Sequence, residues 1–224
     1  MLELTERWRA TYPDAYVGIL VMHDVRNPES CPPLEAEKAR LERELRDRFS
    51  CLGRAGIKAH PTIEAYNAYY KGFKKTYHVQ HQLESVALKE RDIPRAAALV
   101  EAMFMAELAY LLLTAGHDWD AVTLPLYVDV AEGSESYVRI NGHEQALKAG
   151  DMVIADAEGI LSSIIYGPDR RTMITPETRN AVFTTYAPPG VPRELVCRQI
   201  NAIRDNVLMI APDAVVEILA VLPG

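Results

Sequence analysis

The sequence has few cysteines, and their spacing forms no motif. Cys31, Cys51 and Cys197 are its three cysteines; they lie far apart and make no CxxC pair. An odd number of isolated cysteines argues against a disulfide framework and against a zinc site, and it is typical of a reducing compartment. The first residues, MLELTERWR, also lack the basic and then apolar pattern of a secretion signal. The sequence therefore predicts a cytoplasmic protein.

Long uninterrupted hydrophobic runs are also missing. The most apolar stretch, residues 96–114, contains Glu101 and Glu107 near its middle. Two carboxylates at those positions are costly in a bilayer, so a buried core helix is a better interpretation than a membrane span. We expect a soluble protein without a membrane partner.

The common catalytic and cofactor motifs are absent. There is no GxxxxGK[ST], GxGxxG, HExxH or GxSxG, which argues against dedicated nucleotide use, metal hydrolysis and serine-type acyl transfer. His78 and His81 share one helical face, but no third metal ligand lies nearby in the sequence. Ser162 and Ser163 lie inside a predicted strand, where structural hydrogen bonding explains them better than nucleophilic chemistry. We expect no cofactor and no metal.

A net positive charge is lacking as well, because the formal net charge is −7. A protein that grips a phosphate backbone unaided usually carries a basic face, so we expect no DNA partner, and RNA contact would need a local patch. The most basic and aromatic segment, KGFKKTYHVQH (residues 71–81), allows two interpretations. It is either a solvated loop or helix edge with aromatic anchors, or a patch in which Lys71, Lys74 and Lys75 touch phosphate or a ligand carboxylate.

The 224 residues are 49% hydrophobic and 25% charged, as in an ordinary soluble globular protein. Apolar residues at helical spacing predict helices, one of them a long buried helix opened by Ile93-Pro94 and ended by Gly116, while short β-branched runs predict strands. The other predicted elements are helices over residues 3–10, 34–49, 63–73 and 194–207, and strands over residues 15–25, 124–130 and 214–221. Helices gathered before an antiparallel sheet predict an α+β fold with a mixed, largely antiparallel sheet, as one domain over residues 1–224.

Residues 137–189 contain several short apolar runs, each closed by a turn signal. The pair Asn141-Gly142 favours a tight hairpin, because both positions tolerate positive φ. The predicted strands cover residues 137–140, 152–155, 160–166 and 182–186. We expect a compact antiparallel sheet here, and a binding or reaction site against it.

His117-Asp118-Trp119-Asp120 follows the long predicted helix directly. Ionisable groups just past a buried helix are well placed to face a cavity, and histidine transfers protons near neutral pH. The alternative is a helix-terminal cap with Trp119 packed in the core.

Several segments also follow the order of a known family. They are NGHE (141–144), DMVIAD (151–156), EG (158–159), IYG (165–167), Thr178, Asn180 and AP (187–188). This order resembles the B3/B4-type domain of the phenylalanyl-tRNA synthetase beta subunit, with its "DG-E", "DLVIAD-EG" and "T-NVLLE-A-F-P" patterns. HDWD (117–120) is similar to the family's "H-A-F-D". The resemblance covers roughly residues 82–190, is strongest over 137–189, and is weak over the first 81 residues.

The resemblance implies a B3/B4-like fold and a free-standing copy of this domain, one that cannot aminoacylate by itself. In the synthetase, the domain hydrolyses tyrosine wrongly attached to the phenylalanine tRNA, because an apolar pocket rejects an added hydroxyl poorly. The resemblance implies that His117 is the catalytic histidine and that Gly167 belongs to a glycine-lined wall. We place Thr184, Tyr166, Lys74, Lys75 and His78 with Gly167 in the substrate-binding set.

One departure from the family pattern bears on the chemistry. Thr184 stands where the family has a glutamate, and LSSIIYGP (161–168) replaces the glycine-rich "A-x-x-G-G-I-x-G-G". Thr184 accepts a hydrogen bond but cannot act as a carboxylate base, so the expected pocket is bulkier and more polar. Two hypotheses follow: an editing hydrolase acting on mischarged aromatic aminoacyl-tRNA, or a non-catalytic module for an amino-acid-like small ligand or RNA. The candidate partners are tRNA, aminoacyl-tRNA and an amino-acid-like ligand.

Overall fold

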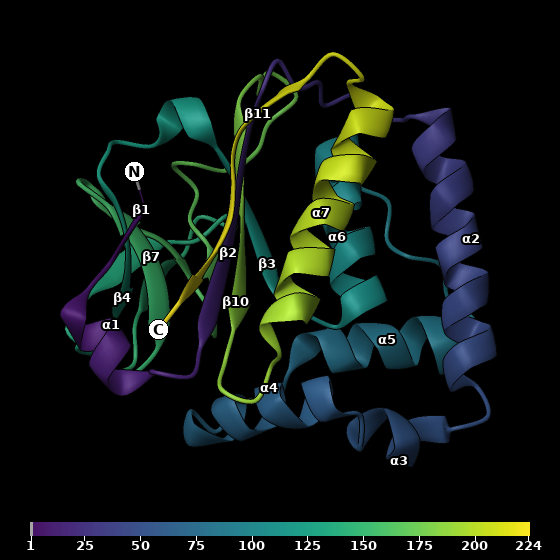
Figure 1. Ribbon diagram of the computed structural model, residues 1–224, viewed down its shortest axis with the longest axis horizontal. Coiled ribbons are helices and arrows are strands. Elements are labelled where there is room, and N and C mark those ends of the chain that lie inside the picture. Colours follow the sequence, from purple (N-terminus) through teal and green to yellow (C-terminus); the bar gives the residue numbers. More distant parts are fainter. Residues whose placement is uncertain (1) are drawn as a thin grey trace.

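The computed structural model describes residues 2–224 and places one β-sheet between a second sheet and a layer of helices (Figure 1). In chain order the elements are β1 (Leu2–Leu4), α1 (Glu6–Thr11), β2 (Tyr16–His23), α2 (Pro32–Phe49), α3 (Gly53–Lys58), α4 (Pro61–Gly72), α5 (His78–Leu88), α6 (Ala98–Tyr110), β3 (Thr114–Asp118), η1 (Trp119–Ala121), β4 (Leu126–Val130), β5 (Ser136–Val138), β6 (Glu144–Ala146), β7 (Met152–Asp156), β8 (Gly159–Ser163), β9 (Gly167–Pro168), β10 (Ala181–Ala187), α7 (Arg193–Ile210) and β11 (Val215–Pro223).

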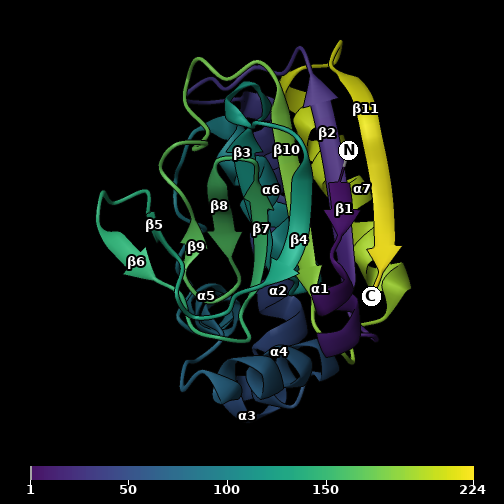
Figure 2. The same ribbon diagram turned by 90° about the vertical axis from the view of Figure 1, so that its left-hand side faces the viewer.

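Three sheets form from these strands. One has the order β11-β2-β10-β3 and is antiparallel throughout, and the second has the order β1-β4-β7-β8-β9 with a single parallel pair, β1–β4. The third is the hairpin β5–β6, which stands away from the rest of the molecule (Figure 2). The predicted α+β class with a largely antiparallel arrangement is confirmed.

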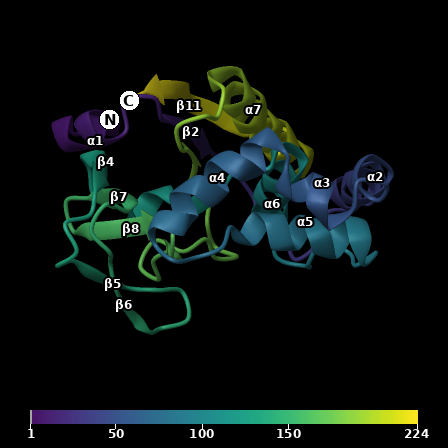
Figure 3. The same ribbon diagram turned by 90° about the horizontal axis from the view of Figure 1, so that it is seen from below.

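The helices cover one face and one end of the four-stranded sheet. Helices α6 and α7 lie against this sheet and α2 lies outside them (Figure 1), while α4 crosses the lower end of the molecule (Figure 3). Side chains of both large sheets and of these helices share one continuous apolar core. In α2, for example, Leu34, Leu45 and Phe49 recur at helical spacing and are buried, each stabilising the fold by about 1.5–3 kcal/mol.

The end of α6 differs from the prediction. Gly116 was expected to end the helix, but the helix ends at Tyr110, and Leu111 takes the left-handed conformation with φ of 60°. The next residues, Leu112 and Leu113, are buried, and Thr114 begins β3. Gly116 and His117 are therefore strand residues, and HDWD does not follow the helix directly.

The expectation of one compact sheet over residues 137–189 was wrong. Its strands divide among all three sheets, and β10 pairs with β2 and β3 rather than with β8. The hairpin at Asn141-Gly142 is confirmed, since Gly142 has φ of 82° and its N–H donates to Arg139 O. The predicted strand 160–166 stops at Ser163, because the Ser163 hydroxyl accepts the N–H groups of Ile165 and Tyr166 and turns the chain.

Helix α5 was missed, because the basic segment 71–81 hides its start. Residues 74–77 form the connection from α4, and α5 begins at His78. Among the helices of residues 2–224, none combines the length and the apolar character that crossing a bilayer requires.

Candidate functional site

A cavity of about 630 Å³ opens between α6, β3, the start of α5 and the turn that joins β8 to β9. This volume lies within the range of small-molecule sites. Most of the lining is apolar and includes Val100, Met103, Phe104, Leu113, Ile164 and Ile174. The cavity therefore suits a ligand with a bulky apolar part.

The turn after β8 supplies one wall of the cavity. Gly167 has φ of 83°, and a Cβ atom added there would meet nothing within 4 Å, so its backbone conformation rather than close packing favours glycine. Its carbonyl accepts a hydrogen bond of 2.6 Å from the Tyr137 hydroxyl. Tyr166 lines the cavity beside it, and Lys75 Nζ lies 5.4 Å from the centroid of the Tyr166 ring. This wall carries an aromatic face with a cation near it.

Gly116 lines the cavity from β3, and a side chain there would crowd the residues around it. A Cβ atom at this position would lie 2.9 Å from Ile174 Cδ1, 3.2 Å from Met103 Sδ and 3.2 Å from Phe183 Cδ1. A side chain of any size would therefore push into the apolar lining. The small residue keeps this part of the cavity open.

Few polar side chains reach the cavity, and two of them, Glu107 and Arg139, are an acid and a base. Glu107 comes from α6 and is buried, with one carboxyl oxygen accepting the Thr114 N–H at 2.9 Å. Burial raises the pKa of Glu107 to about 8. Arg139 is half-buried in the lining, and only its backbone makes hydrogen bonds among residues 2–224. The cavity thus presents a buried carboxyl and an unpaired cation.

His117 lies outside this lining and is fully buried in β3. Its Nδ1 atom lies 2.8 Å from Thr172 Oγ1, and its Nε2 atom lies 3.3 Å from Ser162 Oγ. Burial, helped by the charge of Arg171, lowers the pKa of His117 to about 3. The imidazole is therefore neutral at pH 7, and both of its nitrogens are engaged by hydroxyl groups.

The direction of these hydrogen bonds follows from Asp169. Its carboxylate accepts the Thr172 hydroxyl, so Thr172 Oγ1 accepts from His117 Nδ1. The Nε2 atom of His117 then accepts from the Ser162 hydroxyl. Ser162 Oγ in turn accepts from the hydroxyl of Tyr186, which belongs to the cavity lining. The chain Asp169–Thr172–His117–Ser162–Tyr186 thus connects the histidine to the cavity through two hydroxyl groups.

The other sequence-predicted residues divide between the cavity and its surroundings. Tyr166, Gly167 and His78 line the cavity, and His78 lies at its exposed rim. Lys75 is a neighbour through Tyr166, whereas Lys74 is exposed and outside the lining. Thr184 is buried in β10, where its hydroxyl lies 3.5 Å from Ala115 O, and it does not line the cavity.

Glu107, Arg139 and Tyr186 are cavity residues that sequence reasoning did not place there. A signal existed for Glu107, because a carboxylate within an almost wholly apolar helix needs a partner or a special role. Arg139 gave none, since a single arginine beside a hairpin turn is ordinary. In the described part of the chain, His, Cys, Asp and Glu side chains form no group of three that could hold a metal ion.

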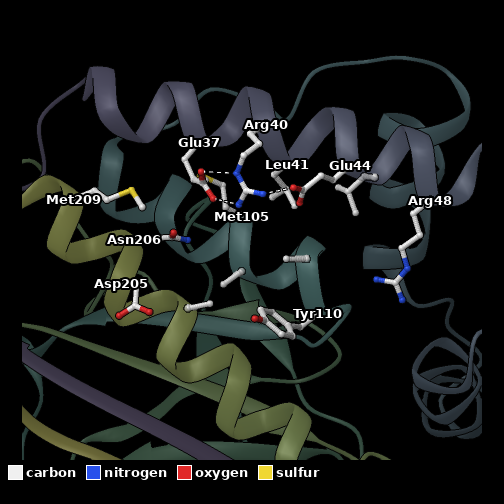
Figure 4. Close-up of a pocket in the computed structure, with 14 residues that line it drawn as sticks. Glu37, Arg40, Leu41, Glu44, Arg48, Met105, Tyr110, Asp205, Asn206 and Met209 are labelled. Carbon is white, nitrogen blue, oxygen red and sulfur yellow. Dashed lines mark hydrogen bonds and ion pairs between the residues drawn. The ribbon is translucent and has the colours of Figure 1, made fainter.

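A second pocket, of about 520 Å³, lies between α2, α6 and α7 (Figure 4). Its central cation, Arg40, is held by the carboxylates of Glu37 and Glu44 on the same helix. These exposed pairs neutralise one another and contribute little to stability. The charge of Arg40 is therefore neutralised by carboxylates of its own helix.

Comparison with known proteins now adds to this geometry. Residues 63–199 match the model of the B3/4 domain family. The chain belongs to the B3/4 domain family. The matched span contains every residue that lines the cavity, from His78 to Tyr186. The predicted family resemblance is confirmed, and it extends further toward the N-terminus than residue 82.

A solved structure shares the fold of this B3/4 chain. It is an N-terminal fragment of the phenylalanyl-tRNA synthetase beta subunit from Pyrococcus horikoshii, 12% identical, with a TM-score of 0.52. The similarity covers 100% of this chain and 54% of that one, so the chain spans about half the length of its structural relative. Among curated proteins, no sequence matches significantly. The structural likeness supports the fold, and function rests on the cavity.

Proposed function

We propose that this B3/4 domain binds an amino-acid-like ligand with an aromatic side chain in the cavity between α6 and β3. The observation that carries the proposal is an apolar cavity whose lining includes Arg139, a residue whose side chain has no ion pair and no hydrogen bond among residues 2–224. Apolar walls take up an aromatic ring, and a guanidinium binds a carboxylate through paired N–H groups. An aromatic amino acid combines these two features.

Calorimetric titration of the full chain with L-phenylalanine tests this proposal. Saturable binding is expected, and Arg139→Gln should weaken it roughly 10-fold or more, because a charge-assisted hydrogen bond is lost. Arg193→Gln is the matched control, since Arg193 is exposed on α7 and lies outside the cavity lining. Absence of binding for L-phenylalanine, L-tyrosine and L-tryptophan would refute the proposal.

A second candidate is hydrolysis of a mischarged aromatic aminoacyl-tRNA. Its support is the family together with Lys75, which lies beside the cavity wall at Tyr166 and is exposed, as a phosphate contact requires. The solved relative is named as part of a phenylalanyl-tRNA synthetase, which links this fold to aminoacyl chemistry in that protein. In the reaction, water adds to the ester carbonyl carbon, the bond to the ribose oxygen breaks, and that oxygen takes a proton.

The position of His117 limits how it serves this reaction. Both ring nitrogens are engaged, so the histidine would act on the cavity through Ser162 and Tyr186 rather than by binding water itself. Positioning of water and of the substrate's own ribose hydroxyl would then supply most of the rate. Release of tyrosine from Tyr-tRNA(Phe) by the purified protein is the test. No release from this or from other mischarged aromatic tRNAs leaves binding as the function.

A further inference from the structure

Two carboxyl groups of α6 are buried, and only one of them has a cationic partner in the part of the chain that the structure describes. Glu101 lies 2.8 Å from Lys38 Nζ, so its charge is neutralised by a lysine of α2. Glu107 is 2% exposed, and within the described residues it forms no ion pair. A buried carboxylate without a cation is costly, and removal of its charge needs either a proton or a bound cation.

The two oxygens of Glu107 also differ. Oε2 accepts the Thr114 N–H, which ties the end of α6 to the start of β3. Oε1 has no hydrogen-bond partner among residues 2–224, and it is not one of the fully enclosed unsatisfied atoms, so it retains some accessible surface. Glu107 also belongs to the cavity lining. The structural hydrogen bond uses one oxygen, and the other is left for a ligand.

We propose that Glu107 binds the primary ammonium group of the ligand, so that the cavity selects aromatic compounds that carry an amine. This inference rests on the proposed function, because it assigns one group of the same ligand. Arg139, from another part of the lining, is then the group that binds the carboxylate or ester end. An ammonium supplies up to three N–H donors, and a carboxylate in an apolar wall is a strong acceptor for them.

The tyrosines near Glu107 cannot neutralise its charge as a cation would. Tyr66, Tyr70 and Tyr77 lie close enough for the charge of Glu107 to raise their pKa values further, after burial has raised them first. These phenols are therefore neutral at any pH of interest. In the lining itself the titratable groups are His78, Arg139, Tyr166 and Tyr186 besides Glu107. Burial lowers the pKa of His78 from its ordinary value, and this group needs a control.

Binding of an ammonium group to Glu107 should be accompanied by release of a proton. With a pKa of about 8 in the free protein, Glu107 is mostly protonated at pH 7, and a bound ammonium stabilises its charged form. Binding should therefore release close to one proton per ligand at pH 7. Affinity should rise up to about 10-fold per pH unit between pH 6 and pH 7.5, while an alkylamine stays protonated to about pH 10.

The test uses three compounds that share a phenyl ring: L-phenylalanine, phenethylamine, which lacks the carboxylate, and 3-phenylpropionate, which lacks the amine. We expect the wild-type chain to bind both amines, with phenethylamine releasing a proton in calorimetry across buffers of different ionisation enthalpy. Glu107→Gln should weaken phenethylamine binding roughly 10-fold to 100-fold and abolish proton release. His78 is intact in this variant, so its titration cannot imitate the loss. Glu101→Gln, which removes a buried carboxyl outside the lining, should leave phenethylamine affinity unchanged.

The outcomes separate the two proposals without depending on any variant. If 3-phenylpropionate binds and phenethylamine does not, the cavity binds aromatic acids and the role of Glu107 is refuted while ligand binding stands. If phenethylamine binds without proton release at pH 7, Glu107 is not the ammonium site. If none of the three compounds binds, the proposed function and this inference both fail.

Discussion

His117 Nε2 lies 3.3 Å from the hydroxyl oxygen of Ser162, and the two side chains are completely buried. Ser162 Oγ is also hydrogen-bonded to the hydroxyl of Tyr186, and of these three residues only Tyr186 lines the cavity. Two hydrogen bonds therefore separate His117 from Tyr186, the residue of this chain that lines the cavity. In this fold His117 provides hydrogen-bond partners for two buried hydroxyl groups, those of Thr172 and Ser162.

Removing the imidazole should therefore destabilise the protein. His117→Ala removes one hydrogen-bond partner each from Thr172 and Ser162 and leaves an internal void, and we expect a loss of about 2–4 kcal/mol in the free energy of unfolding. Urea denaturation at pH 7 measures this loss. His143→Ala, on the exposed hairpin β5–β6, is the control and should change stability by less than about 0.5 kcal/mol. Equal effects of the two substitutions would contradict the buried hydrogen-bonded role.

The same burial makes stability depend on acid. Because the pKa of His117 is lowered to about 3 in the folded chain, the unfolded chain binds a proton at about pH 6.5 and the folded chain does not. The stability that neutral His117 contributes is fully present above pH 6.5. It is lost as the pH falls toward 3, at up to about 1.4 kcal/mol of unfolding free energy per pH unit. His117→Asn should lack this part of the slope when unfolding free energies are compared between pH 4 and pH 7. An unchanged slope would show that His117 is protonated in the folded protein.

Glu107 should act on stability in the opposite direction. Its folded pKa of about 8 lies above that of an unfolded glutamate, so the stability that Glu107 contributes is fully present below about pH 4.5 and is lost as the pH rises to 8. Glu107→Gln keeps an acceptor for the Thr114 N–H, and it should be more stable than the wild type at pH 9 by on the order of 1–3 kcal/mol. Thermal unfolding of both proteins at pH 5 and pH 9 measures the difference. A variant that is less stable at both pH values would show that the charged carboxylate has a partner in the fold.

Two glycines of the cavity should respond differently to alanine. Gly116→Ala puts a methyl group 2.9 Å from Ile174 Cδ1 and should reduce L-phenylalanine affinity by filling the cavity. Gly167→Ala meets nothing within 4 Å but has φ of 83°, so it should cost about 1–2 kcal/mol of stability. Calorimetry on both variants measures the loss of affinity caused by filling the cavity. Urea denaturation measures the loss of stability caused by backbone strain. Loss of affinity in Gly167→Ala alone would contradict this assignment of the walls.

The lysines before α5 test the link to RNA. Lys74 and Lys75 are exposed, and Lys75 lies beside Tyr166 at the cavity wall. If they contact phosphate, replacing both with Glu should abolish tRNA retention on a filter and leave the thermal unfolding temperature unchanged. Lys58→Glu, at the end of α3 and also exposed, is the control for a general change in charge. Retention equal to wild type in the double variant would remove tRNA from the proposal.

Local patterns predicted several features of the fold correctly. The Asn141-Gly142 turn and the apolar spacing of α2 follow from short-range rules, and the structure confirms both. Strand partners depend on contacts far apart in the chain, so β10 could not be assigned to β2 and β3 from its own residues. Gly116 was misread as a helix end because leucine is a rare residue in the left-handed conformation that Leu111 adopts.

The residues of the candidate site also divide into those that the sequence predicted and those that depend on contacts far apart in the chain. Tyr166 and Gly167 were placed by family resemblance, and both line the cavity. Glu107 was noted only as a charge that argues against a membrane span, since sequence spacing does not reveal that Lys38 neutralises Glu101 and leaves Glu107 alone. Thr184 was expected at the site from the family resemblance but does not line the cavity, whereas Glu107 lines it from α6.

The most direct test of the account is to locate bound L-phenylalanine on the protein by amide chemical-shift changes. We predict saturable shifts concentrated at Gly116, Tyr166 and Gly167, with little change at Arg40 and Tyr110 of the second pocket. Shifts centred on Arg40 and Tyr110, or no saturable shift at any amide, would contradict the proposal that the cavity between α6 and β3 is the ligand site.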